Sequence, residues 1–127
     1  GVLMVDMDGL KAINDHYGHR AGDAAIMAFA EHLCAAARVT DTVARLGGDE
    51  FAVLILPVDD DESIAEGVAR LTAVMSKPFN FRYQDLHLTL MASAGSAIAP
   101  RDGIKADELL DRADQAMYAM KRQHKSS

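Results

Sequence analysis

Two segments rich in β-forming residues, 42–46 and 51–56, flank Gly47-Gly48-Asp49-Glu50, and this pattern restricts the fold more than any other feature of the chain. Adjacent glycines permit the positive φ angles of a tight turn, so the pattern predicts an antiparallel hairpin. Because glycine has no Cβ, a ligand can also approach the backbone of this turn closely. The two acids that follow would present carboxylates beside a bare backbone.

A second acidic cluster, Asp6 and Asp8, follows the apolar run 1–5. The run predicts a buried strand that ends at Asp6 and delivers its carboxylate there. Carboxylates at two strand ends of one sheet supply the hard oxygen ligands that Mg²⁺ or Mn²⁺ prefers, and nucleotide phosphates would complete the coordination shell. The alternative is a glycine hairpin whose acids are simply solvated.

The remaining hydrophobic pattern predicts helices and two further strands. A short helix over 10–16 ends at Gly18, and apolar positions between 26 and 37 have helical spacing. A third helix has its apolar face within 64–75, and the acids at 59–62 would favour its N-terminus. Strands over 79–83 and 86–98 precede a last amphipathic helix with apolar positions from 109 to 120. The order predicts one α/β (α+β) domain over residues 1–127, with a largely antiparallel sheet in a ferredoxin-like or polymerase-palm-like arrangement.

Composition argues against several classes of function. The 127 residues include 13 Lys and Arg against 19 Asp and Glu, which gives a net charge of −6. This balance argues against a domain that coats nucleic acid or an anionic membrane through bulk charge. The apolar runs are too short to cross a bilayer, and the apolar start lacks a basic leader. We therefore expect no nucleic acid polymer as partner, no direct membrane contact and a cytoplasmic location. The single cysteine, Cys34, cannot form an internal disulfide, which fits a reducing compartment. It lies in a predicted helix, and we expect it to pack in the interior rather than to act as a nucleophile.

Four blocks of residues occur in order along nearly the whole chain. They are Asp6 to Asp15 with Gly18-His19 and Gly22-Asp23, then Arg45 to Phe51, then Ser93-Ala94-Gly95, and finally Ala113 to Tyr118 with Lys121. In these blocks the chain resembles the GGDEF domain, the catalytic domain of diguanylate cyclases. The resemblance implies a nucleotidyl cyclase fold and the condensation of two GTP into cyclic di-GMP, a bacterial second messenger, with release of pyrophosphate.

The resemblance also implies roles for the matching residues. Asp6, Asp49 and the carbonyl of Met7 match ligands of Mg²⁺ or Mn²⁺. Asp49 also matches the general base, Glu50 completes the acidic pair, and Lys11 matches a lysine near the phosphates. The residues that match contacts to GTP are Asn14, His19, Asp23, Gly47, Gly48, Lys121 and Lys125. A carboxylate suits guanine because N1–H and the N2 amine are parallel donors that adenine lacks.

The residues on predicted helices have structural alternatives. Asn14 would end a helix, Asp23 would cap the next one, Lys11 would be solvated and His19 structural. The chain also departs from the family pattern near its C-terminus, where His124 replaces a glycine and Lys125 keeps a positive charge. The family segment Asp-x-Leu-Thr-Gly-Leu-x-Asn-Arg is absent before Gly1, which implies a longer protein with fused sensory or effector domains.

Arg38 and Asp41 form an Arg-x-x-Asp sequence just before the first hairpin strand. An arginine can grip a phosphate or the O6/N7 edge of guanine, while a carboxylate accepts from its N1–H and N2 donors. The spacing matches the family's inhibitory site and so implies product inhibition by cyclic di-GMP. The alternative is a weak surface ion pair.

Alternatives also exist for the function as a whole. A product with two equivalent phosphodiester bonds, made by chains with one metal site each, implies a catalytic homodimer. A different class of function is a non-catalytic module that senses GTP or cyclic di-GMP and regulates an attached domain. Degenerate family members of that kind usually lose the acidic hairpin, which is intact here. The acidic balance counts against a third alternative, a palm-type transferase acting on nucleic acid.

Overall fold

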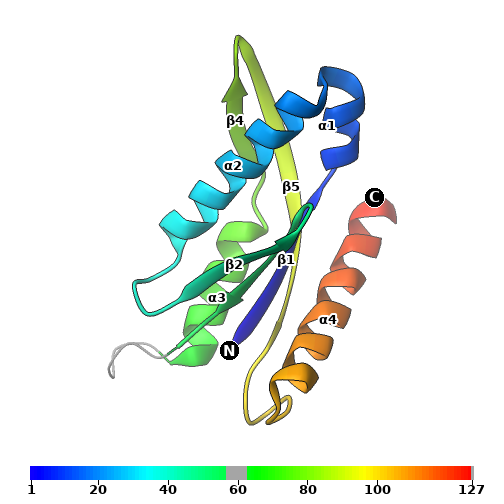
Figure 1. Ribbon diagram of the computed structural model, residues 1–127. Coiled ribbons are helices and arrows are strands. Elements are labelled where there is room, and N and C mark those ends of the chain that lie inside the picture. Colours follow the sequence, from blue (N-terminus) through cyan, green and yellow to red (C-terminus); the bar gives the residue numbers. More distant parts are fainter. Residues whose placement is uncertain (57–62, 127) are drawn as a thin grey trace.

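The computed structural model describes residues 1–56 and 63–126, without the side chains of Lys125 and Ser126. The acids at 59–62 and the Lys125 side chain therefore lie outside the described residues. The elements are β1 (Val2–Asp8), α1 (Leu10–Tyr17), α2 (His19–Ala36), β2 (Thr42–Gly47), β3 (Glu50–Leu54), α3 (Ile64–Met75), β4 (Phe79–Tyr83), β5 (Leu86–Ala97) and α4 (Ala106–Ser126) (Figure 1). This is the order that the sequence predicts.

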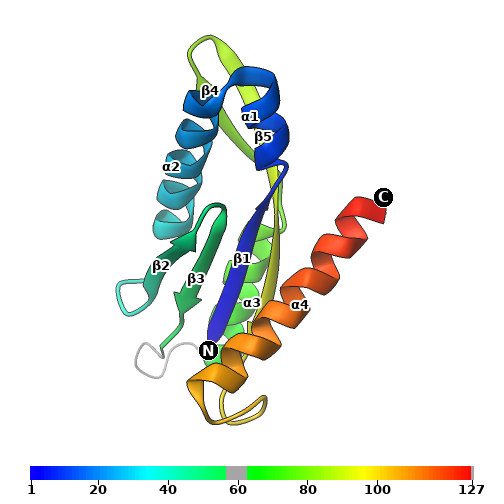
Figure 2. The same ribbon diagram turned by 45° about the vertical axis from the view of Figure 1, so that its right-hand side comes forward.

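The strands form one five-stranded sheet in the order β2-β3-β1-β5-β4, and all neighbouring strands are antiparallel. Helices α1, α2 and α3 contribute to a larger core on one face, and α4 packs on the other face in a smaller core. Figures 1 and 2 show α4 standing apart from the other helices, with its C-terminal end near the end of β1. The α+β fold with a largely antiparallel sheet is therefore confirmed.

Strand β1 divides its side chains between these two cores. Leu3, Val5 and Met7 belong to the larger core, whereas Val2 and Met4 pack with α4. Because successive side chains in a strand point to opposite faces, Asp6 and Asp8 continue the row of Val2 and Met4. The expectation that the strand ends at Asp6 is wrong, because β1 stays paired with β5 as far as Asp8. Both acids therefore lie on a rigid strand and on the side of α4.

Gly95 fixes how closely α4 approaches the sheet. A Cβ at Gly95 would overlap the backbone of Met117 and Ala113, so the helix backbone lies directly on β5 at this position. Only glycine permits that approach. The contact lies one turn of α4 before Lys121 and therefore sets the height of that side chain above β1.

Two local features of the helices complete the fold. Ser63 caps α3, and its Oγ accepts a hydrogen bond from the Glu66 backbone amide at 3.2 Å. Cys34 is exposed on α2, so the expectation that it packs inside is wrong. Within the described residues, none of the helices has the length and apolar character needed to cross a membrane.

Candidate active site

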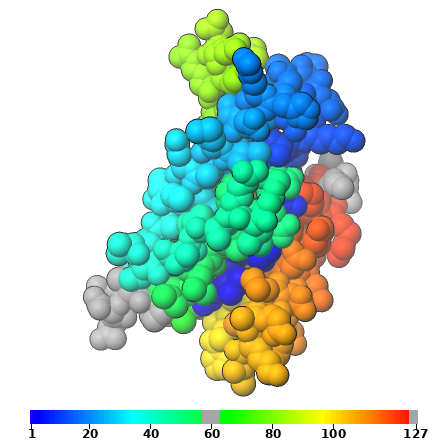
Figure 3. Space-filling model, in the orientation of Figure 1, coloured from blue at the N-terminus to red at the C-terminus, as the bar shows by residue number. Residues whose placement is uncertain are grey.

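The β2–β3 hairpin brings its acids beside Asp6. Gly47 and Gly48 have φ angles of 149° and 51°, values that favour glycine, as the sequence predicts for this turn. The Asp49 carbonyl accepts a hydrogen bond from the Met7 amide at 3.0 Å, and Glu50 pairs with Asp6 in the β1–β3 register. The two acidic clusters, predicted to lie at strand ends of one sheet, are on the neighbouring strands β1 and β3 and in the turn before β3. Parts of β1 are visible between this hairpin and α4 in Figure 3.

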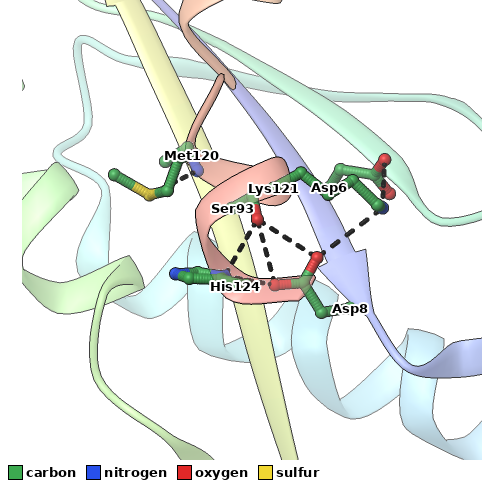
Figure 4. A network of polar contacts seen from close by, with 7 residues as sticks. Asp6, Asp8, Ser93, Met120, Lys121 and His124 are labelled. Atoms are coloured by element: carbon green, nitrogen blue, oxygen red, sulfur yellow. Dashed lines mark hydrogen bonds and ion pairs between the residues drawn. The ribbon is translucent and has the colours of Figure 1, made fainter. Parts of the chain in front are cut away.

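Lys121 reaches this acidic site from α4. Its Nζ lies 2.8 Å from Asp6 Oδ2 and 3.6 Å from Asp8 Oδ1, so one ammonium group bridges both carboxylates of β1. Figure 4 shows the Lys121 side chain crossing to Asp6 and Asp8. The Asp6 side chain is 9% exposed, and its Oδ1 is buried with no hydrogen-bond partner among the described residues.

Burial dominates the electrostatics of Asp6. Removal from water raises the pKa of Asp6 to about 6, and the hydrogen bond from Lys121 opposes this rise while the charge of Asp49 adds to it. Burial lowers the pKa of Lys121, but its hydrogen bond with Asp6 and the nearby carboxylates outweigh burial and raise it above the usual value. At neutral pH the site therefore holds a charged lysine against clustered carboxylates.

Asp8 is the centre of a second set of contacts. His124 Nδ1 lies 2.7 Å from Asp8 Oδ2, and Ser93 Oγ lies 3.0–3.1 Å from both oxygens of Asp8. Ser93 Oγ is also 3.1 Å from His124 Nδ1. In the sequence, Asp8 belongs to an acidic cluster, Ser93 to one of the four blocks, and His124 to the C-terminal segment that departs from the family pattern. None of these positions indicates that the three side chains contact one another. Only the docking of α4 on β1 and β5 brings them together.

Comparison with known proteins agrees with this geometry. The family profile described as "Diguanylate cyclase, GGDEF domain" matches residues 1–127. The chain belongs to the GGDEF domain family. It is 41% identical over 122 residues to the bifunctional diguanylate cyclase/cyclic di-GMP phosphodiesterase MucR of Pseudomonas aeruginosa, which covers 96% of this chain but 17% of MucR. The GGDEF domain thus spans about a sixth of that relative.

Solved GGDEF domains share its fold. The crystal structure of the GGDEF domain of TpbB (YfiN) from Pseudomonas aeruginosa superposes with a TM-score of 0.82 at 38% identity, covering 96% of this chain and 75% of that one. The GGDEF domain of DgcB from Caulobacter crescentus, solved in complex with c-di-GMP, gives a TM-score of 0.73 at 28% identity and covers 96% and 71% of the two chains.

The GGDEF domain brings Asn14 and Asp23 close together. A Cβ at Gly22 would overlap the Asn14 side chain, so the Asn14 amide packs directly on the backbone next to Asp23. Asp23 lies inside α2, which begins at His19, so the alternative of a helix cap is wrong. The helix-end alternative for Asn14 is wrong as well, because α1 continues to Tyr17.

Lys11 and His19 lie on the surface of the GGDEF domain. Lys11 is exposed in the first turn of α1, and His19 is the exposed first residue of α2. The connection through Gly9, which has φ 84°, places α1 directly after β1. The surface position of Lys11 and His19 leaves both side chains able to reach a ligand.

The Arg-x-x-Asp sequence of the GGDEF domain forms a turn that contacts α3. The Arg38 amide donates to Asp41 Oδ2 at 2.9 Å, and the Asp41 side chain is only 2% exposed. Arg70 of α3 lies 4.0 Å from Asp41 Oδ2 and donates to the Ala36 carbonyl at 2.7 Å. The sequence does not predict Arg70 here, because its position depends on how α3 packs against α2. The buried Asp41 is inconsistent with a merely solvated surface pair.

Proposed function

We propose that this GGDEF domain is a diguanylate cyclase that condenses two GTP into cyclic di-GMP and releases pyrophosphate. The observation that carries the proposal is the position of the intact Gly47-Gly48-Asp49-Glu50 turn against Asp6. A glycine turn, a carboxylate pair and a lysine are thereby gathered at the end of β1, where nucleotide phosphates require positive charge and a close backbone. The family assignment supports the same chemistry.

The site has the chemistry that Mg²⁺ or Mn²⁺ requires. Asp6 and Asp49 offer carboxylate oxygens and Met7 a carbonyl, and the buried Asp6 Oδ1 accepts no hydrogen bond from the described residues. Asp6, Asp49 and the Met7 carbonyl would fill only part of the coordination shell, and substrate phosphates would supply further oxygen ligands. The ion would neutralise charge on the reacting phosphate.

The residues of the chain supply positioning, charge and a base. In each half-reaction the ribose 3′ oxygen of one GTP bonds to the α-phosphorus of the other, and the bond to the β-phosphate oxygen breaks. Asp49, assisted by the acidic Glu50, accepts the 3′ hydroxyl proton, and pyrophosphate leaves with the electron pair. Lys121 and Lys11 provide positive charge toward the phosphates. The Lys121 ammonium group contacts the carboxylates of Asp6 and Asp8. Lys125 would add a further phosphate contact.

Guanine selection is assigned to the α1–α2 pair. The Asn14 side chain packs on the Gly22 backbone, and Asp23 is the next residue of α2, so an amide and a carboxylate would be offered to one base. Asp23 would accept from guanine N1–H and N2, and His19 would contact the same substrate. A base without that pair of donors would leave the carboxylate unsatisfied.

The proposed assembly is a homodimer. The described residues of one chain form one acidic site beside β1, whereas the product needs two equivalent bond-forming events. We therefore propose that two domains face each other with one GTP each. The small share of MucR that the chain covers supports fused sensory or effector domains. We place the domain in the cytoplasm, where GTP is available.

Product inhibition is assigned to the Arg38–Asp41 turn. Arg38 would grip a phosphate or the guanine O6/N7 edge of cyclic di-GMP. Asp41, whose side chain is 2% exposed, would hold the turn that carries Arg38 rather than accept from the guanine N1–H and N2 donors. Arg70 lies beside Asp41 and can add a second guanidinium group from α3. The complex of the DgcB GGDEF domain with c-di-GMP supports this ligand class.

The deciding experiment is incubation with GTP and Mg²⁺ followed by chromatography for cyclic di-GMP. The protein is expected to form cyclic di-GMP and pyrophosphate, and to form neither after removal of the metal by EDTA. A folded, dimeric protein that binds GTP and forms no product would support the sensing module instead.

A further inference from the structure

We propose that His124 is a positioning residue that, through Asp8 and Ser93, fixes the Lys121 ammonium at the acidic site. The inference rests on the proposed function, because there Lys121 is a phosphate contact. It adds a role for the residue that stands in place of the family's glycine, and glycine has no side chain with which to make this contact.

His124 and Lys121 reach β1 from the same face of α4. They are three residues apart, which places them on one face of a helix. Lys121 Nζ contacts Asp6 Oδ2 at 2.8 Å and Asp8 Oδ1 at 3.6 Å, while His124 Nδ1 contacts Asp8 Oδ2 at 2.7 Å. The two oxygens of Asp8 are therefore divided between the lysine and the histidine, as Figure 4 shows.

Ser93 fixes the same carboxylate from β5. Its side chain is fully buried, and its Oγ lies 3.1 Å from Asp8 Oδ1, 3.0 Å from Asp8 Oδ2 and 3.1 Å from His124 Nδ1. Ser93 pairs with Asp6 in the β1–β5 register, so its backbone position is set by the sheet. A carboxylate held by donors from two other elements has little freedom to rotate away from Lys121.

The proton positions that satisfy these contacts follow from the donor and acceptor types. An ionised carboxylate only accepts, so the short contact requires a hydrogen on His124 Nδ1. The Ser93 hydroxyl then donates to Asp8 and can accept from the same imidazole N–H. Asp8 therefore receives hydrogen bonds from His124 and Ser93 and the positive charge of Lys121. With His124 absent, Asp8 Oδ2 would retain only Ser93 among these donors.

The network borders a space that a ligand can enter. Asp8, Gly9, Lys121 and His124 line a cavity of about 150 Å³. Gly9 adds no side chain to the space, and the His124 side chain is 31% exposed. Lys121 and Asp8 therefore both border the open volume. Asp6 at 2.8 Å holds the ammonium group from one strand position, and Asp8 at 3.6 Å restrains it on the side of the cavity.

The test compares His124→Ala with His124→Asn, since the Asn amide nitrogen can take the place of Nδ1 as donor. Gln123→Ala is the matched control, because Gln123 is an exposed neighbour in the same turn of α4. The probe is 3′-deoxy-GTP with Mg²⁺, which lacks the attacking hydroxyl, and calorimetry measures its affinity. We expect about tenfold weaker binding in His124→Ala, near-parent binding in His124→Asn, and no change in Gln123→Ala. In steady-state assays His124→Ala should raise KM for GTP more than it lowers kcat.

A measurement without nucleotide separates this inference from the proposed function. The ¹H–¹⁵N signal of the Lys121 ammonium group should be protected from exchange in the parent and in His124→Asn, and broadened in His124→Ala. Equal signals and equal affinities in all these variants would overturn the positioning role, even in an active cyclase. A His124-dependent signal in a protein that makes no cyclic di-GMP would support the positioning role and refute the cyclase. A lower melting temperature in His124→Ala, with the Lys121 signal and the affinity unchanged, would show a purely structural contact.

Discussion

Lys121 Nζ lies 2.8 Å from Asp6 Oδ2, a contact between residues that are 115 positions apart. It joins the last turns of α4 to the middle strand of the sheet. The contact occupies one oxygen of Asp6 and leaves Oδ1 buried without a hydrogen-bond partner among the described residues. Asp6 is thus held in place by a cation of the protein itself.

Asp6 should make the metal-free protein less stable as pH rises. Its pKa is raised from 3.8 to about 6 by burial, so between these values the folded state binds more protons than the unfolded state. Stability from this group is therefore fully present below pH 4 and is lost as pH rises through 6. Asp6→Asn should flatten that part of the profile, measured by urea unfolding in EDTA at pH 4 to 7. The exposed Asp85→Asn is the control, and a parent-like slope in Asp6→Asn would refute the role of Asp6.

Asp49→Ala should abolish cyclic di-GMP formation and leave the fold intact. The side chain lies at a hairpin tip, outside both hydrophobic cores, so its loss removes a ligand and a base without creating a cavity. We expect the rate to fall by at least about a hundredfold. Chromatography of the reaction products gives the rate, and circular dichroism checks the fold.

The matched control for Asp49 is Asp85→Ala, an exposed acid in the turn between β4 and β5. It should retain the parent rate. Product formation at the parent rate by a dimeric Asp49→Ala protein would refute the assignment of this acid.

Asp23→Asn should relax the selection of GTP over ATP. Asn offers one acceptor and one donor where guanine requires two acceptors, so the discrimination should fall by at least about tenfold. Competition assays with both nucleotides measure the ratio. Glu31→Gln, an exposed acid further along α2, should leave the ratio unchanged. Unaltered discrimination in Asp23→Asn would show that the base is read elsewhere.

Gly95→Ala should destabilise the domain by about 3 kcal/mol, because the added methyl group meets backbone atoms of α4 that cannot move without shifting the helix. The same displacement would move Lys121 away from Asp6 and lower cyclase activity per folded molecule. Urea unfolding measures the stability. Ser96→Ala, at the next position of β5, is the control and should change stability by less than about 0.5 kcal/mol. Equal stability of the parent and Gly95→Ala would contradict the close approach.

The sequence predicts those parts of the site that depend on local conformation. Gly47 and Gly48 specify the hairpin because they allow the positive φ angles of its turn. The spacing of apolar residues along the chain predicts the order of helices and strands. The apolar run predicts the end of β1 two residues too early, at Asp6, because the strand continues through polar residues and stays paired with β5 as far as Asp8. Likewise, α2 begins at His19 directly after Gly18, and so Asp23 is not a cap.

Turn signals and apolar spacing do not predict contacts between segments that are far apart in the sequence. The contact of His124 with Asp8 spans 116 positions and exists only because Gly95 lets α4 approach the sheet. Arg70 meets Asp41 through the packing of α3, and neither residue predicts the other. Cys34 is exposed because it lies outside the face of α2 that buries Ala25, Phe29 and Leu33.

Arg38→Ala should relieve product inhibition, and Arg70→Ala should do the same. Asp41 is held by the Arg38 backbone amide and lies 4.0 Å from Arg70, so the turn keeps its carboxylate in place when the Arg38 side chain is removed. We expect at least about tenfold weaker cyclic di-GMP binding in Arg38→Ala, because a charge-assisted contact to phosphate or guanine is lost. GTP affinity should stay nearly unchanged, since the turn lies at the far end of β2 from Gly47. Calorimetry with each ligand measures both affinities, and Arg82→Ala, an exposed arginine of β4, is the control. Cyclic di-GMP binding of parent strength in both Arg38→Ala and Arg70→Ala would place the inhibitory site elsewhere.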